Sequence, residues 1–138
     1  MKIAGILMIV LALVIGIVPM FTDCASEGKS LTTADGRSVP MKCHWTARAE
    51  IAMALPLAAV GGMELFGKRK EGQIFLSIMG VVLGVLVILL PTALIGVCAN
   101  PEMICNSTMK PFLILSGSIV ALISLGTLVA GVVRKNQA

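Results

Sequence analysis

Four long apolar segments, separated by shorter polar ones, dominate this chain. They cover residues 3–21, 47–66, 74–97 and 111–133. Each is long enough to cross a hydrocarbon layer of ~30 Å as a helix, which takes about 20 residues. None shows the alternation of apolar and polar residues that a membrane-spanning strand requires. The pattern therefore predicts an all-α, integral membrane four-helix bundle, with residues 1–138 forming a single four-span domain.

Composition supports a membrane location and excludes a soluble domain. Hydrophobic residues make up 57% of the chain and charged residues only 13%, whereas soluble domains contain about 25% charged residues. The net charge is +4, but the basic residues lie at the ends of apolar segments and form no patch with interleaved aromatics. We therefore expect the lipid bilayer as a partner and no nucleic acid.

The distribution of basic residues predicts the orientation. The short connection "GKRKEGQ" (67–73) carries three of them, and Arg134 and Lys135 follow the last apolar segment. Short basic segments beside a membrane mark its cytoplasmic side. We expect a multi-pass protein of the cell membrane with both termini cytoplasmic and two outer loops, residues 22–46 and 98–110. The first segment is interpreted as a retained helix, because no A-x-A cleavage site follows it.

The chain has four cysteines, and all of them fall in the two predicted outer loops. They are Cys24, Cys43, Cys98 and Cys105. Disulfides persist in oxidising compartments outside the cell, and four cysteines allow three pairings. Proximity in the sequence favours Cys24–Cys43 and Cys98–Cys105, one disulfide closing each loop. Pairs between the loops stay open as an alternative.

The two halves of the chain resemble each other. "MKCHWT" (41–46) aligns with "MICNST" (103–108) as M-x-C-x-x-T, and each half reads as helix, outer loop with two cysteines, helix. This arrangement predicts two helical hairpins in the same orientation, a possible parallel repeat about an axis along the membrane normal. Thr46 and Thr108 are expected to cap the N-termini of the second helix of each hairpin.

Small residues are the expected means of helix packing, because lipid leaves no hydrophobic drive between membrane helices. The third segment carries Gly80-x-x-x-Gly84, and the fourth carries Gly126-x-x-x-Ala130. We expect both stripes to lie at close helix–helix contacts.

The polar stretch "MKCHWTARAE" (41–50) holds the candidates for contact with a partner or ligand. These are His44, Trp45, Arg48 and Glu50. Trp45 suits the aromatic belt at the membrane surface, and charged residues within a span are functional candidates by default. Arg48 and Glu50 are two positions apart, so they point to different helix faces. We assign no catalytic residue, no metal ligand and no cofactor from the sequence.

Two alternatives stay open for the cysteines. The first is a membrane thiol–disulfide oxidoreductase that uses the outer-loop cysteine pairs, although the chain lacks the C-x-x-C motif of such enzymes. The second is a soft-metal or haem-binding protein, in which Cys43 and His44 act with Met41, Met103 and Met109. The absence of C-x-x-C-H argues against covalently attached haem.

Together with four spans and paired loop cysteines, "MKCHWTARAE" resembles a family of small bacterial and archaeal membrane proteins described as a domain of unknown function. The resemblance covers nearly the whole chain and implies a four-helix fold. Members of this family look like companions of ABC-type permeases. We therefore expect a non-catalytic accessory or assembly subunit of a larger membrane complex, with an ABC-type permease or further copies of itself as the protein partner.

Overall fold

The computed structural model describes residues 2–137, and most of them are helical. The long helices are α1 (Lys2–Thr22), α2 (Lys42–Phe66), α3 (Lys70–Leu89) and α4 (Lys110–Asn136). A π-helical turn, η1 (Leu90–Leu94), continues α3, and another, η2 (Cys105–Met109), leads into α4. All four helical segments are long and apolar enough to cross a membrane. The predicted all-α membrane bundle is thus confirmed.

Two of the segments begin earlier than predicted. The second begins at Lys42 rather than at residue 47, and the fourth begins at Cys105 rather than at residue 111. Cys43 and Cys105 therefore lie on helical turns and not in loops. The polar residues there satisfy their backbone groups by continuing the helix, which costs little once the apolar part has formed it.

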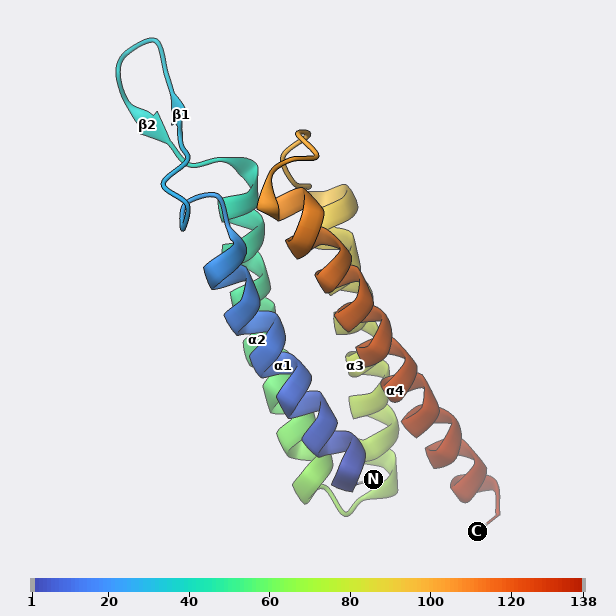
Figure 1. The fold of residues 1–138 in the computed structure, drawn as a ribbon. Helices are drawn as coiled ribbons and strands as arrows, with labels where there is room; N and C mark the ends of the chain where they lie inside the picture. The colour runs from blue at the N-terminus through green and yellow to red at the C-terminus, as the bar shows by residue number, and fades with distance from the viewer. Residues whose placement is uncertain (1, 138) are drawn as a thin grey trace.

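The helices form two hairpins that stand side by side (Figure 1). Helix α1 packs mainly against α2, and α3 mainly against α4. Between α1 and α2 a small antiparallel ribbon, β1 (Leu31–Thr32) and β2 (Ser38–Val39), projects from the bundle. We call the end of the bundle that carries this ribbon and the 95–109 segment the cysteine end. Both chain termini lie at the opposite end, beside the short α2–α3 connection (Figure 1).

The Gly80–Gly84 stripe lies in the contact between α3 and α4. A Cβ added to Gly80 would clash with the Ser124 side chain, and one added to Gly84 would come within 2.9 Å of the Ala121 backbone nitrogen. The missing side chains thus allow the two backbones to approach closely, as small residues do in membrane helices.

The Gly126–Ala130 stripe does not take part in the expected contact. Both residues are exposed, and a Cβ at Gly126 would meet no described atom within 4 Å. Helix α4 turns a different face, with Gly117 and Ser124, toward α3. The expectation of a helix contact at Gly126 and Ala130 is therefore wrong within the described chain.

Candidate functional site

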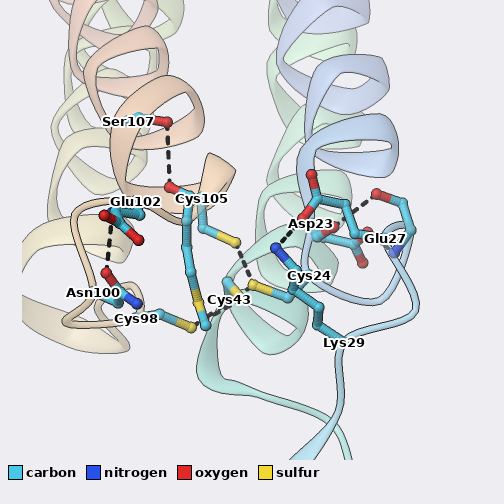
Figure 2. Close-up of polar contacts among 12 residues, drawn as sticks. Asp23, Cys24, Glu27, Lys29, Cys43, Cys98, Asn100, Glu102, Cys105 and Ser107 are labelled. Atoms are coloured by element: carbon cyan, nitrogen blue, oxygen red, sulfur yellow. Dashed lines mark hydrogen bonds and ion pairs between the residues drawn. The ribbon is translucent and has the colours of Figure 1, made fainter.

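All four cysteine sulfurs meet at the cysteine end of the bundle (Figure 2). The Sγ atoms of Cys24, Cys43, Cys98 and Cys105 all lie within 4.8 Å of one another. Cys24, Cys43 and Cys105 are at most 1% exposed, whereas Cys98 is partly exposed. We call these four residues the thiol cluster.

Each hairpin contributes two cysteines in the same way. Cys24 follows the end of α1 and Cys98 follows the end of η1, so each lies just past the first helix of its hairpin. Cys43 lies in the first turn of α2 and Cys105 begins η2, so each opens the second helix. The cluster is thus shared between equivalent positions of the two halves, as a parallel repeat would place them.

The closest sulfur contacts run between the hairpins. Cys24 Sγ lies 2.7 Å from Cys105 Sγ and 3.8 Å from Cys98 Sγ, and Cys43 Sγ lies 3.3 Å from Cys98 Sγ. The first cysteine of one half therefore faces the second cysteine of the other half, in both directions.

The structure contains neither of the disulfides predicted within each loop, Cys24–Cys43 and Cys98–Cys105, and all four cysteines are free in it. The prediction assumed that cysteines close together in the sequence pair with each other. The side-by-side packing of the hairpins instead brings each cysteine close to a residue from the opposite half.

Burial keeps the thiols of Cys24 and Cys98, the two cysteines outside the helices, protonated when no cation is bound to them. It is the main cause that raises the pKa of Cys24, and the hydrogen bond with Cys105 raises it further. Burial likewise raises the pKa of Cys98, and a hydrogen bond with Cys43 acts in the same direction. A protonated thiol is a poor nucleophile, so neither loop cysteine is prepared for attack on a disulfide.

Thr46 holds the second cysteine loop against α2. Its hydroxyl donates to the Gly96 carbonyl over 2.7 Å, across 50 positions of sequence. Gly96 has a φ of +79°, a conformation that glycine adopts without strain. Its amide and that of Ile95 both donate to the Leu90 carbonyl over 3.1 Å. This turn directs the chain back toward Cys98.

Neither threonine of the repeated motif is an N-cap. Thr46 lies inside α2, whose N-cap residue is Met41, and Met109 is the N-cap residue of α4. Neither cap position makes a side-chain hydrogen bond. Because both helical segments start earlier than predicted, Thr46 lies inside α2 and Thr108 lies inside η2, which precedes α4. Thr108 is also exposed.

His44 pairs with Asp23 of the same chain. Its Nδ1 lies 3.1 Å from Asp23 Oδ2, and both side chains are largely buried. The other carboxylate oxygen of Asp23 accepts from the Ser26 amide over 2.9 Å. Because Asp23 precedes Cys24 and His44 follows Cys43, this contact fixes the two cysteines of the first hairpin relative to each other.

The remaining candidates of the 41–50 stretch point in different directions. Trp45 is 59% exposed and Arg48 is exposed. Glu50 is fully buried, and neither of its carboxylate oxygens has a hydrogen-bond partner among the described residues. It lies on the buried face of α2 that also carries Cys43 and Thr46, so one buried polar face begins with the thiol cluster and continues into the span.

The chain matches one family in the comparison with protein families. A family described as a domain of unknown function, DUF4418, matches residues 3–130. The chain belongs to the DUF4418 family. No curated protein and no solved structure matches it.

One signal in this DUF4418 sequence could have led to the thiol cluster. The M-x-C-x-x-T repeat makes Cys43 and Cys105 equivalent, and equivalent residues near a pseudo-two-fold axis approach each other. No feature of the sequence predicts the Thr46–Gly96 hydrogen bond or the inward position of Glu50. Both depend on how α2 is rotated about its axis in the bundle.

Proposed function

We propose that this membrane protein binds a soft metal ion in its thiol cluster, between the two hairpins. One observation carries the proposal: four cysteine sulfurs lie within 4.8 Å of one another. Thiolates are the protein ligands that soft metals such as Cu(I) and Zn(II) prefer. A tetrahedral ion with metal–sulfur bonds of ~2.3 Å holds its sulfurs roughly 3.8 Å apart. The contacts of Cys98 with Cys43 and Cys24, 3.3 and 3.8 Å, are close to that spacing. The Cys24 and Cys105 sulfurs, 2.7 Å apart, would have to separate by about 1 Å on binding.

The same geometry favours metal binding over thiol–disulfide exchange. An exchange centre needs an accessible cysteine of low pKa. Here three of the four cysteines are buried, and burial raises the pKa of Cys98, the one that is partly exposed. Two disulfides would also need only two close pairs, whereas a bound ion requires all four sulfurs to converge. A metal ion binds the deprotonated thiols and releases their protons, and its positive charge offsets part of the negative charge of the thiolates.

A bound ion would also join the two halves of the protein. Each hairpin supplies two of the four ligands, so ligation would close the cysteine end as a cross-link does. We therefore infer one four-span unit, residues 1–138, in which the metal stabilises the side-by-side packing. This role requires no catalytic residue and is compatible with an accessory or assembly subunit.

The proposed orientation places the thiol cluster outside the cytoplasm. The basic residues of the α2–α3 connection and of the start of α3, and those at the end of α4, lie at the end opposite the cysteines (Figure 1). Basic residues flanking spans favour the cytoplasmic side. We infer a protein of the cell membrane with cytoplasmic termini and a metal centre that is loaded from the extracytoplasmic side.

One observation supports an additional accessory role. The Gly126–Ala130 stripe faces away from the bundle, where it can receive a helix of another protein. The partner that we propose for this stripe is a second copy of this chain or an ABC-type permease. Native mass spectrometry of protein extracted gently from its own membrane would test this, and a monomer without partners would contradict it.

Metal analysis tests the main proposal. The protein is purified anaerobically in detergent with a thiol-free reductant, exposed to Cd(II) or Cu(I), freed of excess metal and analysed by mass spectrometry for bound metal. We expect retained metal, and a loss of at least about tenfold in affinity for Cys43→Ser or Cys105→Ser, since even outer-shell changes cost 10–100-fold. Ala99→Ser, which adds a hydroxyl beside Cys98, is the matched control. Wild-type protein that retains neither metal would refute the proposal.

A further inference from the structure

An open pocket beside Cys98 connects the thiol cluster with the surface. It has a volume of about 380 Å³, and Cys98 is among its lining residues together with Met41 and Met103. Cys98 is partly exposed, whereas the other three cysteines are buried. An ion from solution would therefore meet Cys98 first, and it would meet it inside this pocket.

The pocket offers sulfur and no carboxylate. Cys98 Sγ donates to Met41 Sδ over 3.8 Å, so a thioether already touches the exposed member of the cluster. Met103, two residues before Cys105, also lines the pocket. No acidic side chain is among the described residues around it, and the charged residue there is Lys42.

This combination discriminates among metal ions by two physical effects. Thioethers are soft, uncharged ligands that suit Cu(I), whereas divalent ions are held better by thiolate, imidazole or carboxylate. The Lys42 ammonium repels a divalent ion twice as strongly as a monovalent one at the same distance. Both effects favour a monovalent soft cation over Zn(II) at the mouth of the cluster.

We propose that the pocket lined by Met41, Cys98 and Met103 is the loading site through which Cu(I) reaches the thiol cluster. This inference rests on the proposed function and adds the identity of the ion and its route. Cu(I) first binds the two thioethers and the sulfur of Cys98, whose thiol proton passes to water in the pocket. Bonds from copper to thioether sulfur then break, and bonds to the sulfurs of the buried cysteines form. Each new ligand releases its thiol proton to water in the pocket, and copper stays in the +1 state, so no electron is transferred.

The test compares loading rates of two probe ions. Fully reduced protein without metal, in detergent and without oxygen, is mixed with Cu(I) held by bathocuproine disulfonate, or with Cd(II). Formation of thiolate complexes is followed by ultraviolet absorbance. The variant is Met41→Leu/Met103→Leu, which keeps apolar volume and removes both thioethers. Met63→Leu/Met79→Leu, at exposed methionines of α2 and α3, is the matched control.

We expect the variant to load Cu(I) more slowly, by on the order of tenfold, as for other changes around a metal centre. Its final copper content and its Cd(II) loading rate should equal those of wild type, which also shows that the cluster has folded. Copper loading at the wild-type rate would overturn the loading site and leave the metal centre standing. Equal slowing of both ions would also overturn it, since the pocket would then act only by shape. Wild-type protein that takes up neither ion would refute the proposed function itself.

Discussion

Cys24 Sγ and Cys105 Sγ lie 2.7 Å apart although the two residues are 81 positions apart in the sequence. Cys43 and Cys98 form the second close contact, at 3.3 Å across 55 positions. Both contacts join the first hairpin to the second. The thiol cluster is therefore an interface between the halves of the chain and not a property of either loop.

This arrangement predicts which disulfides form when metal-free protein is oxidised mildly. We expect Cys24–Cys105 and Cys43–Cys98, because these sulfurs need to move least. Proteolysis without reduction followed by mass spectrometry identifies the linked peptides. Cys24→Ser should leave Cys43–Cys98 as the main product. Recovery of Cys24–Cys43 and Cys98–Cys105 would show that the hairpins separate before oxidation.

Thr46 provides a second test of how the cysteine end is held together. Thr46→Val keeps the shape of a fully buried side chain and removes its bond to the Gly96 carbonyl. We expect a loss of about 1 kcal/mol in the free energy of unfolding, measured by titration with a denaturing detergent. Affinity for metal should fall as well, since the loop that carries Cys98 loses its attachment.

Thr92→Val is the control for this change. Thr92 is exposed, and among residues 2–137 its hydroxyl bonds only to carbonyls of its own helix turn, those of Ile88 and Leu89. Its loss should leave both stability and metal affinity near the wild-type values. Equal effects of the two substitutions would mean that the Gly96 contact does not hold the loop.

The fold was predictable to the extent that hydropathy determines it. The apolar segments gave four spans, because a helix is the structure that satisfies backbone groups in lipid without a partner strand. Hydropathy says little about the first turns of a helix, which explains why Lys42 and Cys105 were assigned to loops. Polar residues can extend a helix beyond the membrane once the apolar part has nucleated it.

The site was predictable only in its components. The four cysteines, His44 and Glu50 stand out in the sequence, and the spacing of Arg48 and Glu50 shows that they occupy different helix faces. Which of the two faces inward depends on the rotation of α2 about its axis, and that rotation is set by packing against the other helices. The choice between disulfide partners likewise depends on how the hairpins are placed beside each other.

A substitution of the buried Glu50 should stabilise the protein, whereas most substitutions of buried residues lower the free energy of unfolding. Its carboxyl group is fully buried, and neither oxygen has a described partner. Burial of an unpaired polar group is costly, so Glu50→Leu should raise the free energy of unfolding by about 1–3 kcal/mol. Glu71→Leu, at an exposed position in the first turn of α3, controls for a general gain from added apolar surface. A loss of stability in Glu50→Leu would mean that the carboxyl group holds a ligand or partner.

The two glycine stripes give a matched pair of substitutions on neighbouring helices. A Cβ at Gly84 would lie 2.9 Å from the Ala121 nitrogen and 3.0 Å from the Gly117 oxygen, and backbone atoms cannot rotate away. Gly84→Ala should therefore separate α3 from α4 and lower the free energy of unfolding by about 1–3 kcal/mol. Gly126→Ala meets open space, and it should raise stability by about 0.5–1 kcal/mol through helix propensity. Detergent titration of both variants measures the difference. If Gly126→Ala instead destabilises the protein or breaks up an oligomer, the outward stripe is in contact with a partner helix, which would support the accessory role.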